Sequence, residues 1–528
     1  MTGESGAGEQ AGLRTVWEIA AVALVFAAAA AWPAPDINEA VYLTKARHAA
    51  DPAWAAGDFF LETPDAHGVF YLLFRPVAAA LPLEQTAWMG RLAGWLAVAV
   101  GFWHAAAPLV GTTWGRLVAA ALFSLALRHT TLAGEWVLGG CEAKVFAWAL
   151  VLGGVGEWAR GRFATAWLLC GAATAWHPIV GGWALVALVL ARGAQPWERP
   201  LARDALLVAA GLAVAAAGIV PALALSGGAD AATRAAAARI YVVERLHHHL
   251  LPRTFAEAFV ARHLLAVLAW WLLDRLATPS PARRRVAAFT LAALAISTAG
   301  LVISLLEPVA PDVTFGLLRF YWFRLADVIV PLALATSAAA VLEDRAACGR
   351  ASSLPPGLVR AGVTLLVALD VAAQSAHWPL PGRDAPTPRA DAKVDAAAWA
   401  DVCAWVHGHT PAAARFLTPR GSATFTWRTD RPEVVAWKNS PQDAASLVAW
   451  RKRITDCFAA RDTLVGMEQS TAALGADRVR LVADRYGATH AIVPLDAPRL
   501  AEMPGERIYA NACYAVYDLG PAAATEPR

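Results

Sequence analysis

Long apolar runs recur through residues 1–376 and are separated by shorter polar segments. They cover about 16–32, 86–109, 114–128, 142–158, 163–176, 178–191, 204–226, 257–273, 286–306, 316–341 and 358–376. A helix of about 20 apolar residues spans the hydrocarbon core of a bilayer. The pattern therefore predicts a polytopic α-helical membrane protein with about eleven transmembrane helices.

The composition supports this class. Hydrophobic residues make up 58% of the 528 residues and charged residues only 16%, whereas soluble domains carry about 25% charged residues. The 23 Trp residues suit the membrane–water interface, where amphipathic rings lie at headgroup depth. A formal net charge of +3 is too small to indicate a nucleic-acid partner.

Arginine concentrates in alternate loops between the apolar runs. These loops hold Arg116; Arg160 and Arg162; Arg192, Arg199 and Arg203; Arg275, Arg283, Arg284 and Arg285; and Arg345, Arg350 and Arg360. Because basic loops stay in the cytoplasm, this alternation predicts a cytoplasmic N-terminus. Segments 34–85, 129–141, 227–256 and everything after about 377 are then extracytoplasmic. The many Ala and Arg residues favour a bacterial inner (plasma) membrane.

The chain divides into a membrane part and a smaller part after it. Residues 1–14 are expected to be disordered, and 15–376 to form the transmembrane domain, with 34–85 as its first external loop. The first run is interpreted as an uncleaved anchor, although AAAAAWPAP also resembles a signal-peptide cleavage site. A Pro- and charge-rich linker at 377–394 leads to a small extracytoplasmic α/β domain at 395–528. That domain is predicted to contain helices at 396–406, 441–459 and 471–486 and strands at 414–417, 424–427, 434–437, 491–494 and 512–517.

The six cysteines show no CxxC pair and no zinc spacing. If the C-terminal region lies outside the cytoplasm, two of Cys403, Cys457 and Cys513 are candidates for a disulfide. The sequence does not choose the pair.

The first external loop holds many charged and aromatic side chains beside a predicted membrane helix. Asp36 and Glu39 face the same way if their segment is helical, and Asp58 reaches the same space if the loop folds back. Carboxylates at a low-dielectric boundary have shifted pKa values that suit general-base work. The alternative is that each is a solvated loop carboxylate that caps a short helix.

Other ionisable residues lie where apolar runs begin. Glu142 and Lys144 lie at the start of the run at 142–158, and His177 separates two runs. Arg319 and Arg324 lie at the start of the tenth run, at its predicted external end. Ionisable groups at membrane depth are costly unless they are paired or functional, and the Arg fork matches phosphate oxygens. The alternatives are a structural ion pair, a turn histidine, and arginines that extend to lipid headgroups.

Two further clusters have weaker functional interpretations. His247, His248 and His249 are consecutive, and consecutive side chains rarely all face one metal ion. The stretch 416–443 holds Arg420, Arg428, Arg431 and Lys438 among Trp427 and Trp437, a composition that suits a glycan or lipid-phosphate surface but is favoured as an ordinary strand–loop–strand edge. The absence of P-loop and HExxH motifs argues against a transport ATPase and a zinc protease.

The overall plan resembles the GT-C superfamily of membrane glycosyltransferases, which includes protein O-mannosyltransferases and aminoarabinose transferases. One helix is followed by a long acidic external loop, many further helices and an external C-terminal domain. The local match is the segment from Asp36 to Tyr42, DINEAVY, because many of these families carry an Asp-Glu pair followed by Tyr in the first external loop. Glu39 and Tyr42 match this pattern, whereas Asn38 stands where the family has Asp.

The resemblance implies an inverting transfer of a sugar from a polyprenyl-phosphate donor to a glycan, lipid or protein acceptor. Asp36 is the first choice for the base, with Glu39 or Asp58 next, and Lys144, Arg319 and Arg324 are candidates for the phosphate. Glu142 and His177 are further candidates for the substrate site. No cofactor is assigned, and a requirement for a divalent metal stays open.

Two other functions compete with this one. A transporter or lipid flippase predicts polar residues in mid-helix and two related halves, and no such repeat is visible. A non-catalytic envelope binding or assembly protein predicts that the carboxylates of the first loop do not converge. A groove that holds Asp36 or Asp58 near Arg319 or Arg324 would favour the enzyme.

Overall fold

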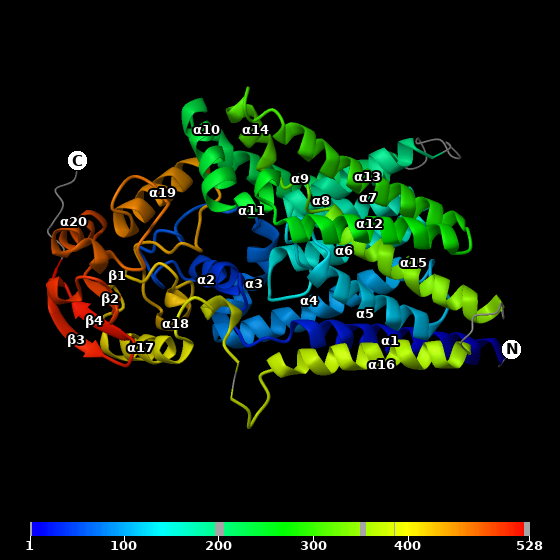
Figure 1. The fold of residues 1–528 in the computed structure, drawn as a ribbon, viewed down its shortest axis with the longest axis horizontal. Helices are drawn as coiled ribbons and strands as arrows, with labels where there is room; N and C mark the ends of the chain where they lie inside the picture. The colour runs from blue at the N-terminus through cyan, green and yellow to red at the C-terminus, as the bar shows by residue number, and fades with distance from the viewer. Residues whose placement is uncertain (1–2, 196–204, 349–354, 385, 522–528) are drawn as a thin grey trace.

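The computed structural model describes residues 3–195, 205–348, 355–384 and 386–521. It shows a bundle of long helices with a small domain at one end (Figure 1). The long helices are α1 (Gly3–Ala30), α4 (Leu83–Ala106), α5 (Thr113–His129), α6 (Ala143–Ala159), α7 (Phe163–Trp176), α8 (Pro178–Gly193), α9 (Ala205–Gly227), α12 (Glu257–Leu276), α13 (Pro281–Ser304), α15 (Ala326–Cys348) and α16 (Pro356–Gln374). Each expected apolar run thus overlaps a helix. Helix α1 begins at Gly3, so most of the segment expected to be disordered is helical.

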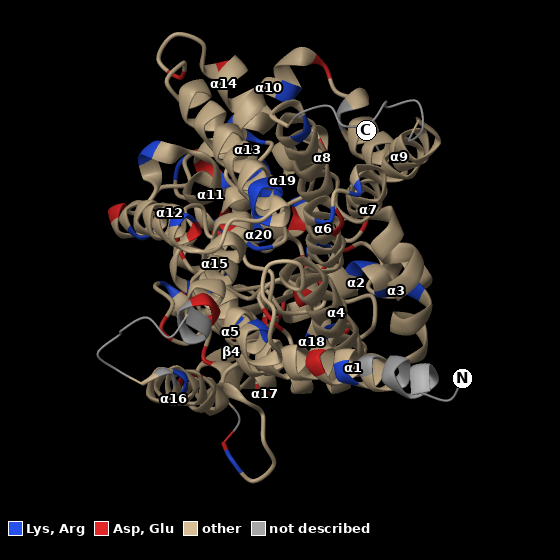
Figure 2. Ribbon diagram, turned by 90° about the vertical axis from the view of Figure 1, so that its right-hand side faces the viewer, with Lys and Arg blue, Asp and Glu red and all other residues tan. Residues whose placement is uncertain are grey.

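Five of the described helices are both long and apolar enough to cross a membrane. They include Gly12–Ala30, Ala205–Leu225, Pro281–Ser304, Ala326–Asp344 and Gly357–His377. Helices α7 and α8 are apolar but shorter. Seen from the end of the bundle, most of the helix ribbons are uncharged (Figure 2). The chain is therefore an integral membrane protein, whereas the expected count of eleven spans is not confirmed.

The loops rich in arginine meet at one end of the bundle. Arg116 forms an ion pair with Glu18 at 2.7 Å. Arg285 donates to the carbonyl of Ala159 at 3.1 Å, and Glu343 accepts from the N–H of Thr112 at 2.8 Å. The opposite end carries the C-terminal domain (Figure 1). The arrangement agrees with the alternation expected from the sequence, but Arg199, Arg203 and Arg350 lie outside the described residues.

Short elements cover the end of the bundle that faces the C-terminal domain. They are α2 (Glu39–Ala50), α3 (Gly68–Ala80), α10 (Ala231–Arg239), the π-helix η2 (Ile240–Arg245), α11 (His247–Leu250), the 3₁₀-helix η3 (Pro252–Thr254) and α14 (Pro311–Leu318). The core of the bundle is built from Ala, Val and Leu with inserted rings, including Phe26, Phe102 and Phe123, which stack edge-on or face-on.

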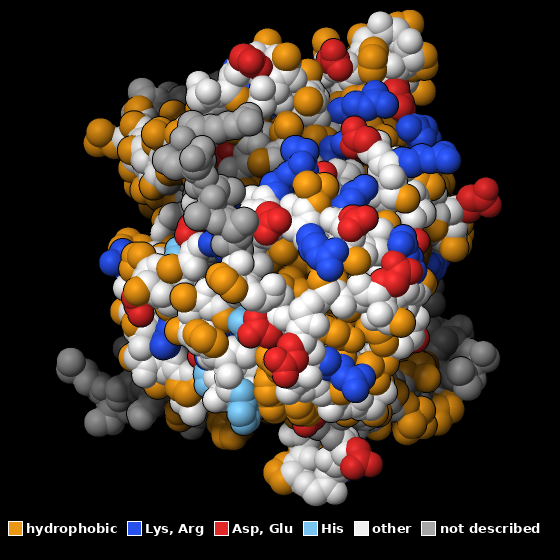
Figure 3. Space-filling view, turned by 90° about the vertical axis from the view of Figure 1, so that its left-hand side faces the viewer, with side chains coloured by type: hydrophobic (Ala, Val, Ile, Leu, Met, Phe, Trp, Pro, Cys, Tyr) orange, Lys and Arg blue, Asp and Glu red, His pale blue; other side chains and the backbone are white. Residues whose placement is uncertain are grey.

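The C-terminal domain contains one four-stranded sheet of order β1-β2-β4-β3. The strands are β1 (Phe416–Leu417), β2 (His490–Pro494), β3 (Glu506–Ala510) and β4 (Tyr514–Asp518), and only the β1–β2 pair is parallel. Helices α17 (Ala396–His409), α18 (Phe425–Thr429), α19 (Ala444–Phe458) and α20 (Ala476–Tyr486) belong to this domain, with the short 3₁₀ turns η6 (Thr471–Leu474) and η7 (Leu500–Glu502). Two further 3₁₀ turns precede it, η4 (Ser375–His377) at the end of α16 and η5 (Arg389–Asp391) in the linker. Its outer face carries interspersed basic and acidic side chains (Figure 3).

Several sequence predictions for this domain were wrong. The expected strand at 424–427 is mostly helix α18, because the Asp391 carboxylate binds both the Thr424 hydroxyl and the Arg428 guanidinium and so fixes the first turn. The expected strand at 434–437 does not form, and the one bridge nearby, between Phe416 and Glu433, lies just before it. Strand β3 was missed, and Gly475, at φ 92°, divides the expected helix 471–486 into η6 and α20.

Cysteine pairing also differs from the expectation. Cys403, Cys457 and Cys513 are free thiols in this structure, and the first two are buried in separate apolar clusters. They pack as small apolar side chains.

A buried pair of carboxyl groups joins the first external loop to the C-terminal domain. Asp58 accepts hydrogen bonds from the N–H groups of Phe60 and Leu61 at 3.0 Å. It also accepts from the N–H of Glu433 at 3.1 Å and from the Thr426 hydroxyl at 3.2 Å. Burial raises the pKa of Asp58. Burial and the Asp58 charge raise the pKa of Glu433 to about 8.

This pair predicts a pH dependence of stability. A carboxyl group whose pKa is raised on folding stabilises the fold at low pH, and this contribution is lost as pH rises through the folded-state pKa. For Glu433 the loss runs from its usual 4.5 to about 8. Glu433→Gln should therefore raise the free energy of unfolding by about 1–3 kcal/mol at about pH 9 and change it little at about pH 5.

Thermal unfolding of the detergent-solubilised chain measures this effect. Glu506→Gln, on the exposed face of β3, is the matched control and should change stability by less than about 0.5 kcal/mol at either pH. An E433Q stability profile parallel to that of the unmodified chain across this pH range would contradict the prediction.

Candidate functional site

The start of α2 is fixed by a buried ion pair. Glu39 accepts from both nitrogens of the Arg91 fork, at 2.6 and 2.5 Å, and both side chains are fully buried. Its oxygens also accept the N–H groups of Asp36 and Cys141, each at 2.7 Å. All lone pairs that face the protein are thus occupied, which makes Glu39 a structural anchor that ties the first loop to α4 and to the segment before α6.

Asp36 is held by a residue from the linker. Arg389 donates to both Asp36 oxygens, at 2.7 and 2.5 Å, and the N–H of Ile37 donates at 2.7 Å. The ring of His377 stacks on Trp32 with centroids 3.9 Å apart. The linker therefore packs against the end of α1 and covers the carboxylate that the sequence put first.

Asp58 does not join Asp36 and Glu39. Its hydrogen bonds run to its own loop and to the C-terminal domain. The guanidinium of Arg319 lies 5.7 Å from the centre of the Phe320 ring. Among the described residues, neither Asp36 nor Asp58 forms an ion pair with Arg319 or Arg324, so the juxtaposition considered from the sequence is not formed.

A different pair of carboxylates meets the expected basic residues. Lys144 lies 3.7 Å from Glu135 and 3.6 Å from Glu142. Arg324 pairs with the other oxygen of Glu135 at 2.8 Å. The Asn38 amide donates to Glu142 at 3.0 Å. These residues form one polar cluster, which we call the junction cluster. They come from the starts of α2 and α6, from the segment just before α15 and from the segment between α5 and α6.

The segment between α5 and α6 is positioned by one buried carboxylate. Asp327, in the first turn of α15, accepts the N–H groups of Leu132 at 2.5 Å, Ala133 at 2.9 Å and Glu135 at 3.2 Å. This segment also needs a small residue at Gly140, where a Cβ would lie 2.5 Å from the Glu39 side chain. These contacts direct Glu135 and Glu142 towards Lys144.

The rings of Tyr42 and His177 both pack against the ring of His67. His177 packs against His67, with ring centroids 4.9 Å apart, and Tyr42 contacts His67 at 5.3 Å. The Nδ1 atom of His67 lies 2.6 Å from an Asp65 oxygen. Burial acts to raise the pKa of Asp65, but the contacts with His67 and Lys45 together lower it below its usual value. His177 also accepts from the N–H of Val180 and so caps α8, which confirms the turn role considered for it.

A backbone distortion marks the rim of the junction cluster. Tyr321 has φ 56°, in the left-handed region that a bulky residue rarely adopts. Its hydroxyl lies 2.9 Å from that of Tyr241, and its ring lies 3.8 Å from the Arg324 guanidinium. Tyr241 belongs to the π-helix η2. Strained residues and π-helical turns are both frequent at functional sites.

Three residues that hold or form this site were not predicted from the sequence as members of it. Glu135 was not singled out, although it lies in a short polar segment between two apolar runs. Arg389 was treated as linker and Arg91 as part of a membrane helix. A charged residue inside an apolar run was the available signal for Arg91, because such a residue needs a partner.

The three consecutive histidines do not gather around one point. The Nδ1 atom of His249 contacts the carbonyl of Ala133, while the ring of His248 packs between those of its neighbours. Within the described ranges, no group of three or more His, Cys, Asp or Glu side chains has the arrangement of a metal site.

Comparisons with known proteins give a family match and two structural likenesses. A family model described as a domain of unknown function (DUF6798) matches residues 397–457, in the C-terminal domain. No curated protein matches the sequence. ArnT from Cupriavidus metallidurans, in a crystal structure with undecaprenyl phosphate, aligns over 98% of this chain and 99% of its own, with 15% identity and a TM-score of 0.45.

The second likeness is to the arabinofuranosyltransferase AftD from Mycobacteria. It covers 96% of this chain but 41% of AftD, with 16% identity and a TM-score of 0.47. ArnT and AftD are both GT-C membrane glycosyltransferases, the class named by the resemblance in the sequence. Because both TM-scores lie below 0.5, the function proposed below rests on the geometry of the site itself.

The Glu39–Arg91 pair predicts a strong effect on stability. Arg91→Met leaves a buried carboxylate without its counter-charge, which typically costs about 3–5 kcal/mol. We expect the apparent Tm to fall by on the order of 10 °C. Thermal unfolding in detergent measures this change.

The control for this prediction is a pair on the surface. Arg499→Met breaks the exposed pair between Arg499 and Glu502 and should leave the apparent Tm almost unchanged, because water screens such a pair. Equal Tm values for the R91M and R499M variants would show that the buried pair is not an anchor.

Proposed function

We propose that the chain is a membrane glycosyltransferase that moves a sugar from a polyprenyl-phosphate donor to an acceptor hydroxyl on the extracytoplasmic face. The observation that carries this proposal is the junction cluster. Two buried carboxylates, a lysine and an arginine meet where the apolar bundle ends and the C-terminal domain begins. Ionisable groups at the end of an apolar bundle are costly unless they are paired or functional, so a cluster of four of them marks a candidate site.

Glu142 is the carboxylate best placed to act as the base. Its oxygens accept from the neutral donors Asn38 at 3.0 Å and Trp136 at 3.3 Å, with Lys144 at 3.6 Å. Asp36 is instead neutralised by the two-pronged contact with Arg389. The resemblance expects an acid at the position of Asn38, and the Glu142 carboxylate lies directly beside that amide. We therefore favour Glu142 over Asp36.

The reaction then follows from ordinary acid–base chemistry. Glu142 takes the proton of the acceptor hydroxyl, and the oxygen of that hydroxyl attacks the anomeric carbon of the sugar. The bond between that carbon and the phosphate oxygen breaks, and the electron pair leaves with the phosphate. Attack opposite the leaving group inverts the configuration. Lys144 and Arg324 keep the local potential positive enough to stabilise two acidic neighbours and the charge that develops on the phosphate.

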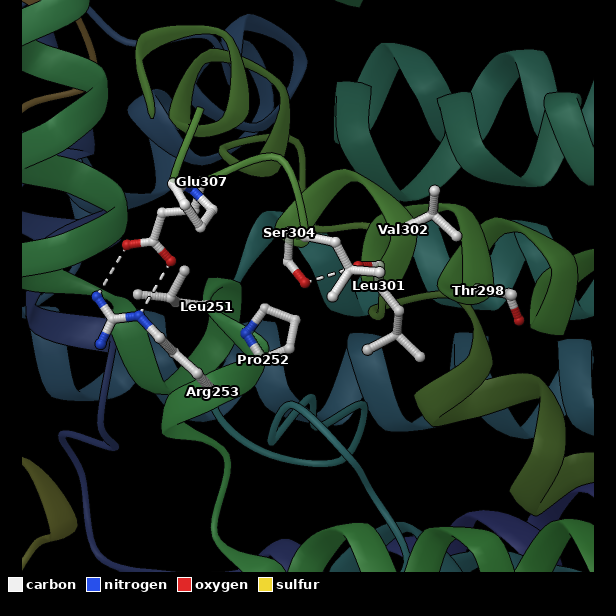
Figure 4. A pocket seen from close by; sticks show the side chains of 10 residues that line it. Leu251, Pro252, Arg253, Thr298, Leu301, Val302, Ser304 and Glu307 are labelled. Atoms are coloured by element: carbon white, nitrogen blue, oxygen red, sulfur yellow. Dashed lines mark hydrogen bonds and ion pairs between the residues drawn. The ribbon is translucent and has the colours of Figure 1, made fainter. Parts of the chain in front are cut away.

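A lipid-facing groove offers an apolar surface for the isoprenoid tail. It has a volume of about 530 Å³ and is lined mainly by apolar side chains, among them Leu251, Leu301, Val302 and Leu305 (Figure 4). The ion pair between Arg253 and Glu307, at 3.0 Å, lies at one side of it. Leu251 lies two positions after His249, and His249 contacts Ala133 in the segment before α6. The groove therefore adjoins the elements that form the junction cluster.

Two substitutions test the choice of base. Glu142→Gln keeps the shape of the side chain and removes its basicity, so transfer from a labelled polyprenyl-phosphate sugar should fall by about 10²-fold or more. Asp36→Asn should reduce transfer much less, because that carboxylate is already neutralised by Arg389. Transfer is measured in purified chain whose apparent Tm is unchanged.

The opposite order of activities in the two variants would overturn the choice of base. Full activity in E142Q together with loss in D36N would return the role to Asp36 and make the contact with Arg389 a resting state. Transport of the lipid without any transfer of sugar would instead favour the flippase function.

A further inference from the structure

Two basic side chains beside the junction cluster lack an acidic partner. Arg245 ends the π-helix η2, and Lys438 follows Trp437 in the C-terminal domain. Among the described residues, no carboxylate lies within ion-pair distance of either one, whereas Lys144, Arg324 and Arg389 all have such partners. This difference separates cations that hold the fold together from cations that remain available.

Arg245 is buried to more than nine-tenths of its surface. One terminal nitrogen donates to the carbonyl of Lys438 at 3.3 Å, the guanidinium lies 5.3 Å from the Trp437 ring, and the Nε atom has no hydrogen-bond partner. An unpaired buried cation costs several kcal/mol, so its retention calls for a ligand. The contact with the Lys438 backbone also shows that the membrane part and the C-terminal domain meet at this point.

The charges around Lys438 show that the region is positively polarised. Burial and the charge of Arg245 lower the pKa of Lys438 to about 8. Burial and the charges of His247, Arg245, Lys438 and Lys393 lower the pKa of His248 to about 4. The groups that influence Lys438 also include Lys144, Lys393 and the acid Glu142, which already binds Asn38 and Lys144. A bound anion would relieve this repulsion.

The two side chains are held in place from separate parts of the chain. Glu244, next to Arg245, pairs with Arg451 of α19 at 2.8 Å. Tyr241 of the same π-helix contacts Tyr321, whose strained backbone lies beside Arg324. The π-helix that carries Arg245 is therefore held by contacts with both the C-terminal domain and the segment before α15.

We propose that Arg245 and Lys438 bind the phosphate group of a phosphorylated substrate. A guanidinium and an ammonium together match the oxygens of a phosphate ester, and charge-assisted hydrogen bonds of this kind are the strong ones. The inference rests on the proposed function and sharpens it, because it assigns the phosphate to residues outside the compensated pairs of Lys144 and Arg324. The phosphate could be supplied by a lipid or by a free anion, and the experiment separates these sources.

The test compares a polyprenyl phosphate with the corresponding polyprenol, which has the same tail and no phosphate. Binding of each to the full chain in detergent is measured as Kd. The unmodified chain should bind the phosphate at least about 10-fold more tightly than the alcohol. In the double variant R245M/K438M this preference should fall to about one, while the affinity for the alcohol stays the same.

Stability provides a second readout. Met fills the volume of either side chain without its charge, so the double variant should unfold at the same temperature as the unmodified chain or higher. A purely structural role for Arg245 would lower the Tm instead. Arg253→Met is the matched control, because that arginine is exposed and already paired with Glu307, and it should leave the preference unchanged.

The possible outcomes are distinct. A double variant that keeps the preference for phosphate overturns the proposal, whether or not the chain transfers sugar. Loss of the preference supports the site, and competition by inorganic phosphate alone would then identify a free anion as the ligand. A chain that prefers the phosphate through these residues but transfers no sugar would contradict the proposed function and leave the anion site intact.

Discussion

The need to neutralise charge inside an apolar bundle governs this structure. Glu39 lies with no exposed surface at the end of a set of apolar helices, and it is tolerated because Arg91 and two backbone N–H groups occupy its oxygens. That one constraint fixes the start of α2, the position of the first loop and the path of the segment before α6. Asp327 repeats the principle with three backbone donors, and Glu135 and Glu142 are placed as a result.

Much of the fold was accessible from the sequence because the dominant force was visible in it. Apolar runs gave the helices to within a few residues at α6, α7 and α8, and alternating arginines gave the two ends of the bundle. The small domain was harder to predict. Its sheet is short, and tertiary contacts decide between strand and helix: Asp391 turns 425–429 into α18, and a β-like stretch with Trp437 remains a loop. Local propensity does not contain such contacts.

The site was predicted in part. Polar residues at the ends of apolar runs singled out Glu142, Lys144 and Arg324 as candidates, and the structure brings these three into one cluster. The choice among carboxylates did not follow, because it depends on partners far away in the chain. Asp36 meets Arg389 across 353 positions, and Asp58 meets Glu433 across 375. The spacing of residues along the sequence does not predict contacts between positions so far apart.

Asp58 has a further consequence for how the two parts of the protein depend on each other. Its carboxylate accepts the N–H of Glu433, the residue that makes the single bridge beside β1. A loop side chain thus closes the margin of the sheet at a point where another strand could add. Unprotected sheet margins are templates for aggregation. The C-terminal domain produced alone would therefore present an open margin at this point, and the N–H of Glu433 would lose the Asp58 acceptor.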